Sequence, residues 1–183
     1  MDQATIDLIV KFLPVIAAVL GSVATLITTY LLRNSGILTV NVNSVTITRY
    51  GRDGMGGNQE KKTLEGVVNV DCSFEVDFYN SSETPKSLRA LTIELLPRNT
   101  RKSYPLTIYM PRKVDNPTIT YAPIMPVEIH ILNFPSKEML HHRLSVGFPP
   151  EKINQLQGKV DFFFRGKFPS GKTFRKKLYT EEF

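Results

Sequence analysis

Cysteine and tryptophan are scarce in this 183-residue chain, which has one cysteine, Cys72, and no tryptophan. A single cysteine cannot form a disulfide within the chain, so the small disulfide-stapled domains of secreted proteins are excluded. Histidine is also rare, with only His130, His141 and His142. Adjacent residues of a strand point to opposite faces, so the neighbouring pair cannot readily hold one metal ion, and no cysteine lies nearby. We therefore expect no metal site.

Charge is missing from residues 12–32, a largely apolar stretch that is twenty-one residues long. At a rise of ~1.5 Å per residue, a helix of this length reaches about 31 Å, close to the ~30 Å hydrocarbon core of a bilayer. The sequence therefore predicts a short polar tail at residues 1–11, a transmembrane helix at residues 12–33 and one further domain at residues 34–183.

Two other interpretations of this stretch are a cleaved signal peptide and a buried core helix. A signal peptide has a basic start, ~7–15 apolar residues and then a small-residue cleavage site. Here the leading residues carry Asp2 and Asp7 against Lys11, the apolar stretch is longer, and residues 31–34 (LLRN) make a poor cleavage site. A core helix would show one polar face, whereas only a small cluster of threonines is polar here. A spanning anchor explains the stretch best.

Small residues recur within this helix at intervals of four, at Ala17, Gly21 and Thr25. Such spacing lets two helix backbones approach closely, so these residues are a candidate helix-association face and predict a homodimer. The alternative is that small residues are common in spanning helices and carry no association. The span has no ionisable side chain, so nothing in it indicates an ion path.

The charges beside the span bear on its orientation. Lys11 lies before the span and Arg33 after it, and residues 1–33 carry two aspartates, so their charges balance. The whole net charge of +6 therefore lies on residues 34–183. Because positive residues favour the cytoplasmic side of a membrane, we expect a single-pass protein of the cell membrane with its N-terminus outside and residues 34–183 in the cytoplasm.

Alternation of apolar and polar residues dominates the rest of the chain. It is clearest over residues 68–78, where every second residue is apolar. A period of two is typical of a strand with one buried face, and Cys72 falls on that face as a buried thiol. In the first strand the apolar phase changes after Val42, which predicts a bulge at residues 43–44.

Turn-rich connections separate these alternating runs, notably the glycine-rich stretch at residues 51–62. Many short strands divided by such turns are typical of a sandwich or barrel. Only residues 149–158 look helical, with Gly158 closing a short helix. We therefore predict a mostly β fold, an antiparallel immunoglobulin-like β-sandwich of eight or nine strands. Without a tryptophan and a cysteine pair it is not an antibody-type domain.

Residues 166–173 read GKFPSGKT and match the phosphate-binding pattern G-x-x-x-x-G-K-T. In nucleotide-binding folds a full helix follows that loop, and a further parallel strand supplies an acidic metal ligand. Only ten residues follow Thr173, and Phe168 and Pro169 put bulk where the loop must fold closely around phosphate. We therefore predict a terminal β-hairpin with Gly171 in the left-handed conformation, and no cofactor.

Basic residues gather in this last hairpin and in an earlier turn. They form a candidate basic binding surface that comprises Lys167, Lys172, Arg175, Lys176, Lys177, Arg98, Arg101 and Lys102. Beside a bilayer such a surface attracts anionic lipid headgroups at about 1 kcal/mol per residue, and it suits an acidic protein partner equally. The alternative is a solvated surface without a dedicated partner. We expect no specific nucleic acid, because most aromatic residues between these cations alternate into the core, with Phe163 as the exception.

No nucleophile with a neighbouring base is evident, because the chain lacks G-x-S-x-G and Cys72 lies within a strand. We therefore expect no catalytic residue. The sequence indicates a single-pass membrane-anchored, non-enzymatic binding or scaffold protein with a basic β-sandwich domain. One alternative is a nucleotide-binding protein that uses residues 166–173. Another is an envelope-facing structural subunit, although the residues before the span lack the Gly-Phe-x-x-x-Glu pattern by which pilin-like proteins are processed.

Overall fold

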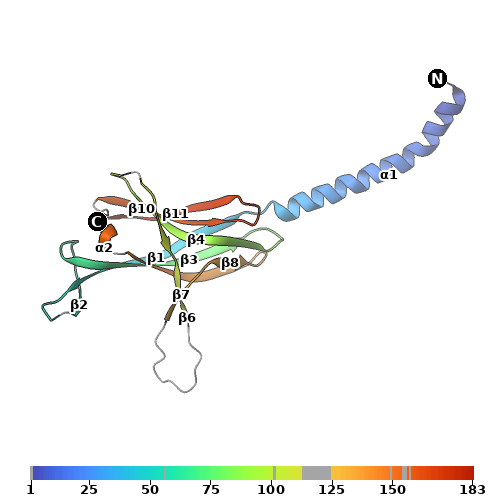
Figure 1. Ribbon diagram of the computed structural model, residues 1–183. Coiled ribbons are helices and arrows are strands. Elements are labelled where there is room, and N and C mark those ends of the chain that lie inside the picture. Colours follow the sequence, from blue (N-terminus) through green and yellow to red (C-terminus); the bar gives the residue numbers. More distant parts are fainter. Residues whose placement is uncertain are drawn as a thin grey trace, which may run out of the picture.

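The computed structural model describes residues 2–55, 57–100, 102–112, 125–148, 150–153, 156 and 158–183. One long helix, α1, projects from a β-sandwich (Figure 1). Helix α1 spans Gln3–Asn34, so residues 3–11, predicted as a polar tail, are helical and continuous with the apolar stretch.

Helix α1 contains one segment that is long and apolar enough to cross a membrane, Lys11–Arg33, with a mean hydropathy of 2.1. None of that segment is buried in the structure, which agrees with the rejection of a core helix. The hydroxyls of Ser22 and Thr25 donate hydrogen bonds of 2.8 Å to the carbonyl oxygens of Ala18 and Gly21. The helix thereby satisfies these polar groups itself, as an apolar surrounding requires.

Two packed sheets form the sandwich, and every pairing between the described strands is antiparallel, as predicted. The first sheet has the order β2-β1-β3-β9-β6-β7, with bounds Asn58–Glu60, Leu38–Arg52, Val67–Asn80, Met139–Phe148, Tyr109–Arg112 and Met125–Glu128. The second has the order β11-β10-β4-β5, with bounds Thr173–Glu182, Lys159–Lys167, Lys86–Pro97 and Tyr104–Thr107. Its fifth strand is β8, Ile131–Phe134, which pairs with β4.

The described residues form eleven strands rather than the predicted eight or nine, because the chain crosses between the sheets inside two runs that look continuous. Strand β5 belongs to the second sheet and β6 to the first, with the fully buried Ile108 between them. Strands β7 and β8 are divided in the same way around Ile129, whose N–H donates to the carbonyl oxygen of Ile108 at 3.0 Å. The third additional strand is β2, within the glycine-rich connection.

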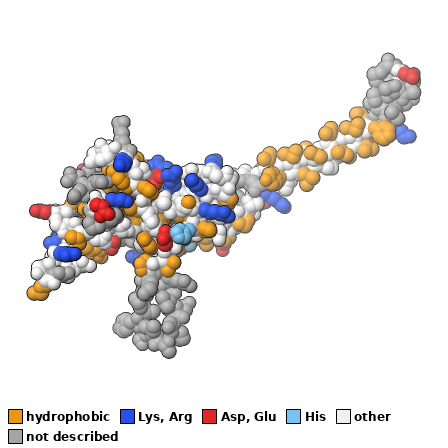
Figure 2. Space-filling view, viewed as in Figure 1, with side chains coloured by type: hydrophobic (Ala, Val, Ile, Leu, Met, Phe, Trp, Pro, Cys, Tyr) orange, Lys and Arg blue, Asp and Glu red, His pale blue; other side chains and the backbone are white. Residues whose placement is uncertain are grey.

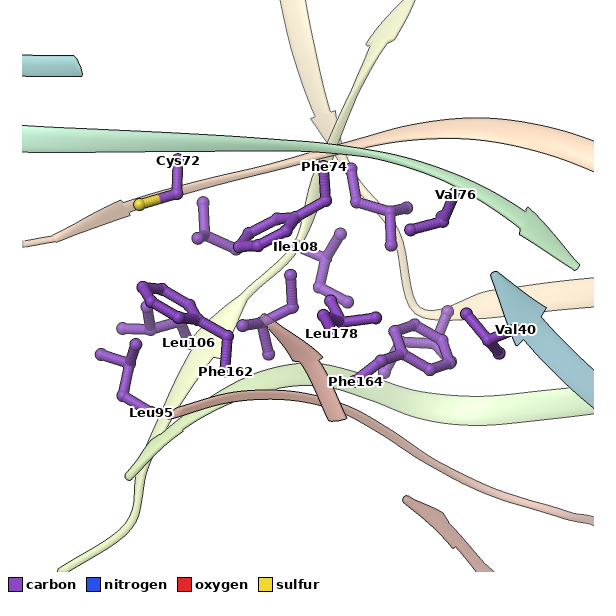
Figure 3. Packing of buried hydrophobic residues seen from close by; sticks show 14 of the residues in the cluster. Val40, Cys72, Phe74, Val76, Leu95, Leu106, Ile108, Phe162, Phe164 and Leu178 are labelled. Carbon is purple, nitrogen blue, oxygen red and sulfur yellow. The ribbon is translucent and has the colours of Figure 1, made fainter. Parts of the chain in front are cut away.

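The core consists of the alternate residues that face inward from both sheets, and it is rich in phenylalanine. Figure 3 shows Cys72 and Phe74 of β3 pointing toward Phe162 of β10. The rings of Phe74 and Phe162 lie 5.4 Å apart between centroids, and those of Phe78 and Phe164 lie 5.1 Å apart. These tilted and edge-on ring pairs hold β3 of the first sheet against β10 of the second.

Local features of the sandwich follow the sequence closely. The pairing of β1 with β3 shifts register between Val42 and Ser44, which confirms the predicted bulge. A short helix, α2, spans Pro150–Ile153, and Gly158 beyond it has a φ of +82°. The predicted helix at 149–158 therefore contains one described turn before the chain enters β10.

Candidate functional site

One predicted basic residue, Arg175, lies with Arg165 around a carboxylate on the outer face of the second sheet. Arg165 donates a hydrogen bond to Oε1 of Glu94, and Arg175 donates from Nε to Oε2 at 2.9 Å. The guanidinium of Arg175 also lies 3.6 Å from the centre of the Phe163 ring, a cation–π contact. Burial acts to raise the pKa of Glu94, but the hydrogen bonds from Arg175 and Arg165 outweigh it and lower that pKa. The charge of Arg175 is therefore neutralised by an ion pair within the sheet.

A second carboxylate, Asp161 of β10, forms ion pairs with two more of the predicted basic residues. Lys177 places Nζ 2.7 Å from Oδ1, and Arg98 places Nε 3.2 Å from Oδ2. The hydroxyl of Thr180 donates to Oδ1 at 2.6 Å. Hydrogen bonds from Lys177, Thr180 and Arg98 hold the pKa of Asp161 well below its usual range, against the opposing effect of burial. The outer face of this sheet is therefore less positive than the count of cations suggests.

The other predicted cations are spread over the sandwich, so the structure does not gather the candidate basic surface into one patch. Lys102 lies in the turn between β4 and β5, and Lys176 is exposed on β11. Lys167 and Lys172 flank the β10–β11 turn. Arg101 lies outside the described residues. Figure 2 shows Lys and Arg side chains on the part of the sandwich that faces the end of α1.

The end of α1 is tied directly to the turn between β3 and β4, an arrangement that no single sequence motif predicts. The N–H of Ile37 donates to Oγ of Ser81 at 2.8 Å, and the N–H of Ser81 donates to the carbonyl oxygen of Ile37 at 3.0 Å. The N–H of Glu83 donates to the carbonyl oxygen of Arg33 at 3.2 Å, and their side chains form an ion pair at 3.7 Å. We call residues 33–37 and 81–84 the junction. It fixes the direction of the helix relative to the sandwich.

A cavity of about 1140 Å³ opens beside the junction, and we call it the junction pocket. The start of β1, the end of β8 and the β10–β11 turn surround it. Its lining includes Lys86 and Lys172, and no carboxylate of the described residues belongs to it. Lys86 donates a hydrogen bond to the carbonyl oxygen of Gly36. Burial, and the nearby charge of Lys172, lower the pKa of Lys86.

Sequence reasoning selected Lys172 and missed Lys86. A signal was present, because Lys86 shares the phase of Leu88, whose side chain is fully buried. A lysine at an inward position at the start of a strand lies at the open end of a sandwich, where its ammonium group reaches the rim.

Residues 166–173 do not form a phosphate loop. The N–H of Phe168 donates to the carbonyl oxygen of Lys172 at 2.9 Å, and the N–H of Gly171 donates to the carbonyl oxygen of Phe168 at 2.9 Å. Gly171 has a φ of +84°, the left-handed conformation that the sequence predicts. The turn joins antiparallel strands β10 and β11, so no helix N-terminus is present to receive phosphate. The predicted hairpin is confirmed.

The histidines and Cys72 form no cluster with one another among the described residues. His141 is bonded to Asp77 through Nδ1 at 2.8 Å, and His130 lies 3.7 Å from Glu128. No group of three or more His, Cys, Asp or Glu within the described ranges could hold a metal ion. Cys72 is buried, and burial raises the pKa of its thiol. This cysteine therefore serves packing.

The candidate helix-association face lies on an exposed side of α1. Ala17, Gly21 and Thr25 are all exposed, and a Cβ atom added at Gly21 would meet no atom within 4 Å. The hydroxyl of Thr25 is bonded within its own helix, so it does not compete with a close helix contact. Association through this face stays a prediction.

The arrangement defines an immunoglobulin-like β-sandwich protein with an apolar N-terminal helix. The model of the YopI Ig-like domain family matches residues 36–179, and the chain belongs to that family. The match confirms the predicted immunoglobulin-like class. It begins at Gly36, at the junction, so the family domain is the sandwich without the helix. The comparison with curated proteins finds no match.

Several solved structures are similar to the chain at low identity. A putative ApaA protein from Bordetella pertussis shares 11% identity with a TM-score of 0.36, over 80% of this chain and 91% of that chain. An uncharacterized β-sandwich protein from Clostridium difficile shares 14% identity with a TM-score of 0.36, over 79% and 89%. AggA, the major subunit of aggregative adherence fimbriae type I from Escherichia coli, shares 14% identity with a TM-score of 0.29, over 78% and 91%. At these values the likeness does not extend to function.

Proposed function

We propose that the chain is a single-pass membrane protein whose helix α1 anchors a non-enzymatic binding or scaffold domain. The observation that carries this proposal is the junction. An apolar segment with no buried part continues through Arg33 into hydrogen bonds with the β3–β4 turn. A helix that only directs secretion has no need of such a built connection to the folded domain.

The domain lies in the cytoplasm and binds through its net positive charge. Residues 34–183 carry the whole charge of +6, which favours the cytoplasmic side and anionic surfaces. The bilayer is the partner of α1. An acidic protein is the partner of the exposed cations that have no ion pair within the described part of the chain, among them Lys102 and Lys176. Self-association through Ala17, Gly21 and Thr25 places two such domains together.

Labelling of a single cysteine in cells tests anchoring and orientation together. Met55 is fully exposed in the β1–β2 turn, so Met55→Cys in a Cys72→Ala background provides one accessible thiol. We expect the protein in the membrane fraction after an alkaline wash, with no reaction toward a membrane-impermeant maleimide until the cells are lysed. The Cys72→Ala chain without the new cysteine is the control for background labelling.

Two outcomes would contradict the proposal. Recovery of the washed protein in the soluble fraction would overturn the anchor. Labelling in intact cells would overturn the cytoplasmic placement and favour the envelope-facing structural subunit. As a matched control, Val19→Asp with Val23→Asp places charge in the span at about 2.5–3.5 kcal/mol per residue near the bilayer centre, and should release the chain from the membrane.

A further inference from the structure

The junction pocket lies at the depth of lipid headgroups when α1 spans a bilayer. The apolar segment ends at Arg33, and the pocket lining begins two residues later at Ser35 and Gly36. The headgroup layer on each side of the hydrocarbon core is about 5–7 Å thick. In Figure 1 the β10–β11 turn lies at the end of the sandwich that meets α1. The pocket therefore lies next to the layer that contains lipid phosphates.

Three cations line this pocket, and Arg175 is paired with Glu94, whereas Lys86 and Lys172 lack such an acidic partner among the described residues. The Lys86 ammonium donates to the carbonyl oxygen of Gly36, and neither Lys86 nor Lys172 forms an ion pair within the described residues. Glu83, the nearest junction carboxylate, is engaged by Arg33 at 3.7 Å and Lys137 at 3.3 Å. Two ammonium groups held together without an anion repel each other, and a bound anion relieves that repulsion.

The rest of the lining suits an amphipathic ligand better than a free ion. Hydroxyl groups and aromatic rings both contribute, from Ser87, Ser170, Thr173, Phe134, Phe168 and Phe174. The volume of about 1140 Å³ is slightly above the range of small-molecule sites, which is about 300–1,000 Å³, and far exceeds a single phosphate ion. A phospholipid fills it with both a phosphate and apolar atoms.

We propose that the junction pocket binds the headgroup of an anionic phospholipid from the leaflet that α1 enters, with Lys86 and Lys172 contacting its phosphate. The inference rests on the proposed anchoring of α1. Binding there adds a second attachment to the one that the helix provides, and it holds the sandwich in a fixed orientation against the membrane.

Thermal unfolding of the full chain in a zwitterionic detergent tests this proposal. We expect short-chain phosphatidylglycerol to raise the melting temperature of the wild type in a saturable manner, and phosphatidylcholine not to do so. Lys86→Gln with Lys172→Gln should weaken the apparent affinity for phosphatidylglycerol by about tenfold or more, because each lost contact is a charge-assisted one. Lys172 is exposed in its turn, so Lys172→Gln alone tests the site even if the double variant folds poorly.

Matched variants and ligands decide between the outcomes. Lys102→Gln with Lys62→Gln removes the same charge at two exposed positions outside the lining and should leave the response intact. An equal loss in that control, or a full response to inorganic phosphate, would overturn the lipid site. A chain that stays in membranes but shows no preference for phosphatidylglycerol refutes the pocket alone. A chain that leaves the membrane on washing refutes the proposed function as well.

Discussion

Replacement of Gly36 by valine is expected to detach helix α1 from the sandwich without unfolding the sandwich. A Cβ atom at Gly36 would lie 2.1 Å from the backbone N and 2.2 Å from the Cα of Ser82, far inside contact distance. Ser82 cannot retreat easily, because its hydroxyl lies 2.6 Å from Oδ1 of Asn80 and 2.7 Å from the carbonyl oxygen of Thr84. The helix end must therefore move, and the hydrogen bonds of the junction are lost.

Hydrogen exchange measures this effect at single amides. Each lost hydrogen bond contributes about 0.5–1.5 kcal/mol, so exchange at Ile37, Ser81 and Glu83 should accelerate about tenfold or more once all of them open together. Gly54→Val is the matched control, because a Cβ atom there would meet nothing within 4 Å. Unchanged protection of these amides in Gly36→Val would show that the junction is not a rigid connection.

Replacement of Phe78 by alanine is expected to cost the largest share of stability. Its ring is fully buried and lies 5.1 Å from the rings of both Phe134 and Phe164, and 5.9 Å from that of His142. Removal of such a side chain typically costs about 3–5 kcal/mol, against a total stability of about 5–15 kcal/mol for a domain. The variant should therefore lose a large fraction of the free energy of unfolding of the domain.

Urea unfolding of the detergent-solubilised chain, followed by β-sheet circular dichroism, provides the measurement. We expect a much lower midpoint for Phe78→Ala and a slope similar to that of the wild type. Met55→Ala, at a fully exposed side chain, should change stability by no more than about 0.5 kcal/mol. Equal midpoints for the two variants would contradict the assignment of Phe78 to the centre of the core.

Much of the sandwich can be predicted, because each strand shows its own alternation of apolar and polar residues. The strict alternation at 68–78 falls within β3, and the phase change after Val42 is the observed bulge. The terminal hairpin also depends only on neighbouring residues, including Gly171. The crossings between sheets could not be predicted in this way. Leu106 and Met110 alternate as if in one strand, and only pairing with β4 and β9 assigns them to different sheets.

The site was predicted less completely, because it depends on segments far apart in the chain. The cations were identified as a class, but pairing of Arg175 with Glu94 and of Lys177 with Asp161 removes part of their charge. Neither carboxylate stands out in the sequence. The junction pocket combines residues from several turns. Lys86 can be identified as a pocket residue only once the fold brings Gly36 and Lys172 to the same pocket.

The most direct test of this account is the depth of the two ends of the sandwich relative to the membrane. Strand β3 has 14 residues and is therefore about 45 Å long, so the β10–β11 and β1–β2 turns are well separated. A fluorophore on a cysteine introduced at Ser170 or at Met55, in a Cys72→Ala background, reports each end in vesicles that carry a headgroup-attached quencher. We predict strong quenching at Ser170 and almost none at Met55. Equal quenching at both positions, or none at either, would contradict a sandwich held against the bilayer by its junction.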